Sequence, residues 1–198
     1  MSKQIALNLI VEAIINGFDK SIKLYQKMTD GEEYFDNAPE YLATVKIAEE
    51  IMKIDGPKTV FLEHNIYELL EKAGGKCRGK YSNSLRINGR CDIAICRGNG
   101  SPRGLIEVKS PLVGNYEIDK DLSRIAEMLV VNNGDHTLQF GIFVFYLSRF
   151  KRDIDNELNI KIDHAKAIAN KFDLRFAKNI VEIKSDISSV VSCFIFQV

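Results

Sequence analysis

The segment LQFGIFVFYL (Leu138 to Leu147) constrains the fold most, because nearly all of its positions are apolar. A strand with one solvated face alternates apolar and polar residues, whereas a strand covered on both faces is apolar throughout. The segment is therefore predicted to be a central strand with a layer of helices on each side. Such a layered arrangement requires an α/β protein.

The rest of the sequence supplies the other elements of such a sheet. Apolar residues at helical spacing, and Gly and Pro as stop signals, set the expected boundaries. Helices are predicted at about residues 3–27, 40–54, 66–73, 118–131 and 151–172. Strands are predicted at about residues 59–63, 86–96, 105–110, 138–147, 179–184 and 191–198. No repeat or flexible linker separates them, so a single domain with a central mixed sheet flanked by helices is expected for residues 1–198.

Composition narrows the possible partners. The chain is 45% hydrophobic, enough for one well-buried domain, and its 27 basic residues equal its 27 acidic ones. This balance argues against a protein that coats nucleic acid through a global positive field. No apolar run approaches the ~20 residues of a membrane helix, and no signal-peptide pattern opens the chain, so a cytoplasmic protein without a membrane partner is expected. The four cysteines form no CxxC pair and predict reduced thiols instead of a zinc site.

Three charged residues interrupt otherwise apolar strands. Asp92 lies in CDIAIC, and Glu107 and Lys109 lie in LIEVKS. Charged residues in such strands must be paired, bind a metal or face a cleft. Because side chains alternate along a strand, Glu107 and Lys109 project from the same face.

The connection between the two strands predicts their register. If residues 98–101 form a four-residue hairpin loop, Arg97 pairs with Pro102 and Asp92 lies opposite Glu107. The Cβ atoms of such neighbours are roughly 5 Å apart, so the two carboxylates share one site. Their repulsion is relieved by a hard divalent cation, for which Mg²⁺ is the natural candidate. Lys109 then stands beside the metal; the alternative is that it forms a simple cross-strand ion pair.

An Asp on one strand followed by Glu-x-Lys on the next resembles the signature of the PD-(D/E)xK nuclease superfamily, whose fold is restriction-endonuclease-like. The family core runs helix, three strands, helix, strand (αβββαβ), and residues 40–147 follow that order. Residues 1–38 would be an N-terminal helical extension, and residues 148–198 an added helix with strands. Two features depart from the pattern: Cys91 stands in place of the signature proline, and the helix at residues 66–73 separates the first two strands.

The resemblance implies a metal-dependent nuclease that hydrolyses phosphodiester bonds, with DNA favoured over RNA. One or two Mg²⁺ ions, with Mn²⁺ as a substitute, would be held by Asp92, Glu107 and the carbonyl of Val108. Lys109 would orient the attacking water or stabilise the transition state.

Family members often carry another acidic residue on the first core helix, a place that Glu49 or Glu50 would fill. Glu49 lies on a stripe with Leu42, Val45 and Met52 and so borders the expected buried face. This position favours Glu49 as the fourth catalytic residue.

Lys120 and Arg124, on the helix after the motif, are candidates for contacts with the phosphate backbone. Asp121 and Arg124 are three residues apart, so a surface ion pair explains Arg124 equally well.

Two broader alternatives stay open. The fold could serve as a catalytically silent module that binds nucleic acid or another partner, although the filled positions 92, 107 and 109 argue against this. The apolar stripe of the first helix must cover either the domain's own sheet or a second subunit, so a homodimer is one of two expectations.

Overall fold

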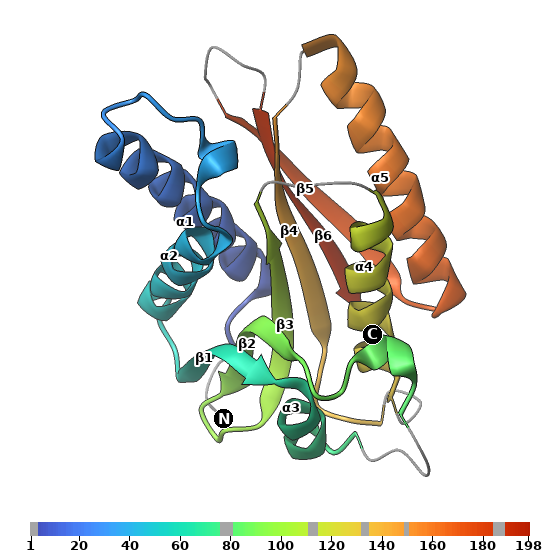
Figure 1. The fold of residues 1–198 in the computed structure, drawn as a ribbon. Coiled ribbons are helices and arrows are strands. Elements are labelled where there is room, and N and C mark those ends of the chain that lie inside the picture. Colours follow the sequence, from blue (N-terminus) through green and yellow to red (C-terminus); the bar gives the residue numbers. More distant parts are fainter. Residues whose placement is uncertain (1–3, 76–80, 111–114, 132–134, 149–150, 184–188) are drawn as a thin grey trace.

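The structure, a computed structural model, describes residues 4–75, 81–110, 115–131, 135–148, 151–183 and 189–198. Within these residues, five α-helices and six strands form an α/β fold around one mixed sheet (Figure 1). The helices are α1 (Leu7–Met28), α2 (Glu40–Lys53), α3 (Ile66–Ala73), α4 (Asn115–Val130) and α5 (Lys151–Lys171). The strands are β1 (Lys58–Asn65), β2 (Arg90–Arg97), β3 (Pro102–Lys109), β4 (Phe140–Ser148), β5 (Arg175–Ile183) and β6 (Ser189–Gln197).

The strand order in the sheet is β1-β2-β3-β4-β6-β5. The first three strands are antiparallel neighbours, and β4 lies parallel to β3 after the crossover through α4. Strand β6 pairs antiparallel with both β4 and β5. This arrangement confirms the α/β class and the mixed sheet, and it puts β3 and β4 in the interior of the sheet.

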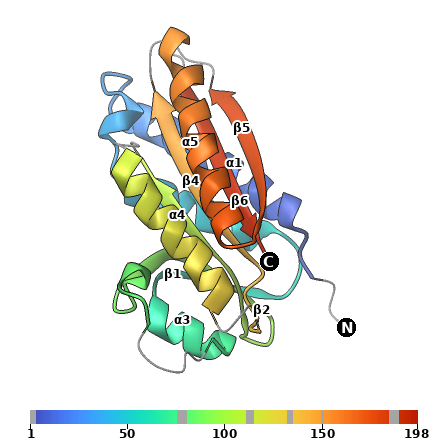
Figure 2. The same ribbon diagram turned by 90° about the vertical axis from the view of Figure 1, so that its right-hand side faces the viewer.

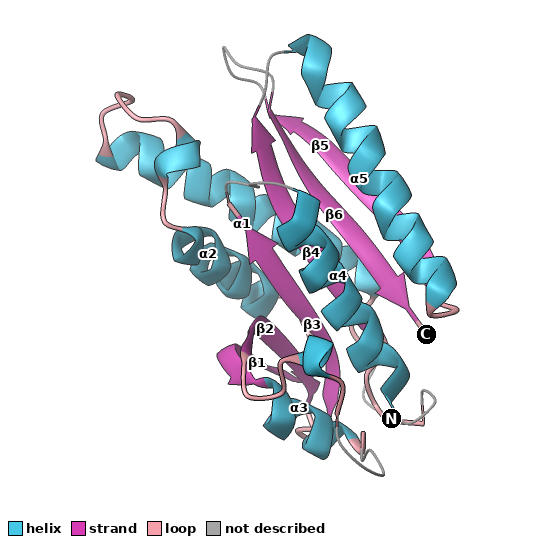
Figure 3. Cartoon of the chain, turned by 45° about the vertical axis from the view of Figure 1, so that its right-hand side comes forward, coloured by secondary structure: helices cyan, strands magenta, loops and turns pink. Residues whose placement is uncertain are grey.

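Helices cover both faces of the sheet, as the apolar strand at residues 138–147 predicts. Figure 1 shows α1 and α2 on one side, and Figure 3 shows α4 and α5 along the other side, with α3 below them. Successive residues of β3 alternate between the layers: Ile106 packs with α1 and α2, whereas Leu105 packs with α3, α4 and α5. Eight consecutive residues of β4 are buried, so this strand has no solvated face.

The apolar stripe of α1 packs on the chain's own structure. Ile14 and Phe18 are fully buried and join a cluster with Ile47 of α2 and Cys193 of β6. The close approach of the two helices depends on Gly17, where a Cβ atom would lie 2.5 Å from the Cα atom of Ile47. The stripe therefore covers the protein's own sheet, one of the two expectations for it.

Several boundaries differ from the sequence prediction. Strand β2 begins at Arg90, not at residue 86, because a short 3₁₀ helix (Asn83–Leu85) and a tight turn over residues 86–89 precede it. Strand β5 begins at Arg175, earlier than expected, where it pairs with Gln197. The expected start of the first helix, Lys3, lies outside the described residues, and α1 begins at Leu7. Cys77 also lies outside the described residues. Cys91, Cys96 and Cys193 are free and buried.

The register of the β2–β3 hairpin is the predicted one close to Asp92 but not at the turn. Ile93 pairs with Ile106, and continuing this register by one residue sets Asp92 opposite Glu107. At the turn, however, Pro102 pairs with Cys96 and not with Arg97. A three-residue loop with Gly100 at φ 81° causes the difference, and a bulge next to Cys96 absorbs the extra residue.

No helix of the described ranges is long and apolar enough to cross a bilayer.

The packing of α1 on α2 predicts the effect of adding one methyl group. Gly17→Ala is expected to lower the free energy of unfolding by about 2 kcal/mol, because the new Cβ atom must push apart two backbones. Asn16→Ala, at an exposed position of the same helix, is the matched control and should change it by less than about 0.5 kcal/mol. Chemical denaturation of both variants measures the effect, and equal stabilities would contradict the close packing.

Candidate functional site

Asp92 and Glu107 approach each other where the pairing of β2 with β3 ends. The Val108 N–H group donates a hydrogen bond of 2.6 Å to Asp92 Oδ2, so the carboxylate of Asp92 ties the two strands together. Glu107 and Lys109 lie on the face of β3 that α4 covers, since Leu105, of the same parity, packs there. The alternation of side chains along β3 thus places both residues as predicted.

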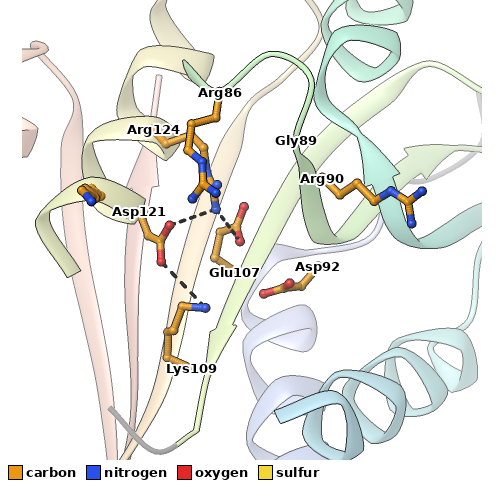
Figure 4. A pocket seen from close by; sticks show the side chains of 9 residues that line it. Arg86, Gly89, Arg90, Asp92, Glu107, Lys109, Asp121 and Arg124 are labelled. Carbon is orange, nitrogen blue, oxygen red and sulfur yellow. Dashed lines mark ion pairs between the residues drawn. The ribbon is translucent and has the colours of Figure 1, made fainter. Parts of the chain in front are cut away.

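These three residues line one pocket of about 320 Å³ between β2, β3 and α4, which we call the Asp92 pocket. Figure 4 shows the carboxylates of Asp92 and Glu107 facing it, with Lys109 below and Arg86 and Arg124 above. Its lining residues are Arg86, Gly89, Arg90, Asp92, Glu107, Lys109, Lys120, Asp121 and Arg124.

Glu107 is 1% exposed and is held by an ion pair with α4. Arg124 Nη2 lies 2.8 Å from Glu107 Oε2 and 3.0 Å from Asp121 Oδ1. The predicted Asp121–Arg124 pair is therefore present, but it is buried inside the pocket and not on the surface. Arg124 is the partner of a buried carboxylate, and Lys120, the other α4 candidate for phosphate contacts, is exposed and lines the same pocket.

Lys109 pairs with two helices and not across the strands. Its Nζ atom lies 3.2 Å from Glu40 Oε1 and 3.9 Å from Asp121 Oδ2. The second carboxylate oxygen of Glu40 accepts a hydrogen bond of 3.2 Å from the Ser110 N–H group. Glu40 is the first residue of α2, so this helix reaches the end of β3 with its N-terminal carboxylate.

Neither expected helix acid reaches the pocket. Glu49 is exposed and pairs with Lys46 at 2.9 Å on the same helix. Glu50 is buried, but it faces α1, where it pairs with Lys20 at 2.7 Å. Lying at the border of the buried face does not bring Glu49 to the pocket, because α2 packs on Ile47 and Ile51 and leaves Met52 53% exposed.

Glu40, and not Glu49, is the acidic residue of α2 that contacts Lys109. Its sequence signal was ambiguous, since it directly follows Pro39 at a helix start, where acidic residues are favoured by the helix dipole alone.

Two carboxylates of the pocket, Glu107 and Asp92, are difficult to ionise. Burial raises the pKa of Glu107 well above its ordinary value, and the charges of Asp92 and Asp121 add to this rise against the opposing charge of Arg124. Burial also raises the pKa of Asp92, against its hydrogen bond from Val108 and the charge of Lys109.

The pKa of Lys109 is also raised, but neighbouring charges raise it and burial does not. Burial alone would lower it, but the charges of Glu40, Asp121 and Asp92 outweigh burial and raise it. Lys109 and Arg124 are each paired with carboxylates of the site.

The donor atoms of the site suit a hard cation. Within the described residues, Glu107 Oε1 is buried without a hydrogen-bond partner. No group of three or more His, Cys, Asp or Glu side chains in the described part of the chain gathers closely enough to hold a metal by itself. A cation here would thus need oxygen ligands besides Asp92 and Glu107, which backbone carbonyls and water can supply.

No family model matches the chain, and neither a curated protein nor a solved structure shows significant similarity to it. Membership of the PD-(D/E)xK superfamily stays a prediction from the residues.

The raised pKa of Asp92 predicts how stability depends on pH. Well below pH 3.8, the ordinary pKa, Asp92 is protonated in both states; as pH rises, the unfolded chain ionises first. The folded protein then binds more protons than the unfolded chain, so its stability falls as pH rises through the folded pKa.

Asp92→Asn keeps an acceptor for Val108 but has no proton to lose. In EDTA, the unfolding free energy of this variant minus that of the parent should therefore increase with pH across this window and then level off. Urea denaturation over a pH series measures it. A difference that stays constant with pH would contradict the raised pKa.

Proposed function

We propose that this protein is a metal-dependent nuclease of the PD-(D/E)xK type, which hydrolyses phosphodiester bonds, with DNA favoured over RNA. One observation carries the proposal: Asp92, Glu107 and Lys109, from two adjacent strands, line the same pocket. Two carboxylates beside a lysine are the groups that phosphodiester hydrolysis with a hard cation requires. The order of elements from α2 to β4 supports the restriction-endonuclease-like core, with α3 inserted between β1 and β2.

Asp92 and Glu107 would hold Mg²⁺, or Mn²⁺ in its place, together with the Val108 carbonyl. Glu107 Oε1, buried without a partner in the described residues, fits this cation. When bound, such an ion lowers the pKa of a coordinated water and neutralises charge on the phosphate.

Lys109 would stabilise charge on the phosphate or orient the attacking water. Glu40 and Asp121 hold its ammonium group from two helices, which fixes its position and favours its charged form. Lys109 is therefore suited to electrostatic stabilisation and not to accepting a proton. Glu40 acts as a positioning residue for Lys109, and Arg124 positions Glu107.

One observation favours the catalytically silent alternative. Glu107 pairs with Arg124, and Lys109 pairs with Glu40, so the ion pairs satisfy one another without a ligand. A scaffold module that binds nucleic acid or another partner would need no more than this network. Cleavage assays with Mg²⁺, Mn²⁺ and EDTA on plasmid, single-stranded DNA and RNA separate the two functions.

The homodimer stays a proposal without support from α1, whose apolar stripe is covered by the chain itself. Light scattering measures the oligomeric state directly.

Lys109→Met tests the catalytic role. Cleavage is expected to fall by about 10²–10³-fold, because the charge that acts on phosphate or water is lost. Calorimetric titration should show that Mg²⁺ still binds, as tightly or more tightly, since a positive charge beside both carboxylates is gone. Lys178→Met, at an exposed position of β5 across the sheet, is the matched control. A Lys109→Met variant that cleaves at the parent rate would leave Lys109 with a structural role only.

A pair of variants on α2 decides which acid serves the site. Glu40→Gln should reduce cleavage by about 10–100-fold, the usual effect of removing a residue that orients a catalytic group. Glu49→Gln, on the same helix and outside the pocket, should leave the rate unchanged. The reverse pattern would return the role of helix acid to Glu49.

A further inference from the structure

Two arginines of the Asp92 pocket have no part in its ion-pair network. Arg86 and Arg90 line the pocket and are exposed, and neither guanidinium group has a hydrogen bond or ion pair within the described residues. Lys109 and Arg124, by contrast, are paired with carboxylates. The rim of the pocket thus carries uncompensated positive charge above a negatively charged floor.

The backbone at Arg86 makes its identity informative. Arg86 has φ 46° and ψ 52°, a left-handed conformation that glycine and asparagine adopt more easily than arginine. Backbone hydrogen bonds hold the turn in place. The Gly89 N–H group donates to Arg86 O at 2.6 Å within the turn. Two N–H groups of α3, those of Ile66 and Tyr67, donate to Gly89 O and Ile87 O. Arginine offers this turn no conformational advantage, and Figure 4 shows its side chain pointing into the pocket. A binding role for the guanidinium group accounts for an arginine here.

A second hollow lies beside the Asp92 pocket at this turn. It has a volume of about 450 Å³, and it shares Arg86 and Gly89 with the Asp92 pocket. We call it the Tyr81–Gly89 groove; Asn83 and Asn88 contribute amide groups to its lining, and Tyr81 contributes an aromatic ring. Amide groups and an aromatic ring are suited to contacts with a nucleobase, whereas Arg86 stands at the junction with the catalytic pocket.

We propose that Arg86 binds a non-scissile phosphate of the DNA strand whose neighbouring phosphate enters the Asp92 pocket, and that the Tyr81–Gly89 groove holds the nucleotide between them. This inference rests on the proposed nuclease function and specifies how the substrate is bound. A guanidinium group binds phosphate through two parallel hydrogen bonds. Its charge also offsets the repulsion between the strand and the carboxylate floor.

Arg86→Gly tests the inference because its two consequences have opposite signs. The variant relieves the left-handed backbone, so the midpoint of chemical unfolding should stay unchanged or rise. Binding of a short fluorescein-labelled DNA oligonucleotide, measured by anisotropy in EDTA and in Ca²⁺, should weaken about ten-fold or more. The slope of log affinity against log salt should shrink by about one, as expected for one lost phosphate contact. Arg86→Asn, which also tolerates this conformation, should behave in the same way.

Matched controls place the effect in the groove. Asn88→Asp adds a negative charge there and should weaken binding, with a smaller effect at high salt. Asn179→Asp and Lys178→Gln make equivalent charge changes on β5, at the far edge of the sheet, and should leave affinity unchanged.

The outcomes separate this inference from the proposed function. If the parent cleaves DNA but Arg86→Gly binds it with parent affinity and salt dependence, the Arg86 site is overturned and the nuclease stands. If the parent binds DNA through Arg86 but cleaves nothing with Mg²⁺ or Mn²⁺, the nuclease is overturned and the binding site stands. A parent protein that binds no DNA overturns the Arg86 site.

Discussion

The buried carboxylate of Glu107 is the constraint around which the site is arranged. It lies 1% exposed on β3, a strand that is paired on both sides with β2 and β4. Taking such a charge out of water costs several kcal/mol unless a partner compensates it. Arg124 of α4 is that partner, and the ion pair fixes the rotation of α4 over the sheet. Asp121 lies on the same face of the helix and therefore reaches both Arg124 and Lys109.

The two helical layers meet at the end of β3, and the site uses both of them. Helix α4 covers the face of Glu107 and Lys109, whereas α2 belongs to the opposite layer with α1 (Figure 2 views the α4 side). Because Glu40 is the first residue of α2, its carboxylate reaches around the strand end to Lys109 and the Ser110 N–H group. The position of Lys109 therefore depends on the packing of both layers, including the close contact of α1 with α2 at Gly17.

The distribution of charge distinguishes the floor of the pocket from its rim. The floor holds the carboxylates of Asp92 and Glu107, whose pKa values are raised chiefly by burial, and a cation would relieve the repulsion between them. The rim presents Arg86 and Arg90, both exposed, which favour an anionic strand. The proposed nuclease requires both, a place for a cation between the carboxylates and positive groups for the strand.

The sequence by itself determined the features that depend on local periodicity. Two-residue alternation put Glu107 and Lys109 on one face, and the short hairpin set Asp92 beside Glu107 even though the turn contained a bulge. Tertiary structure alone decided which helix residues reach the site, because the rotation of α2 is set by its packing on α1 and β3. That rotation turned Glu49 to solvent and brought Glu40 to Lys109, while a left-handed turn docked on α3 aimed Arg86 into the pocket. Such contacts join residues far apart in the chain, and no local pattern specifies them.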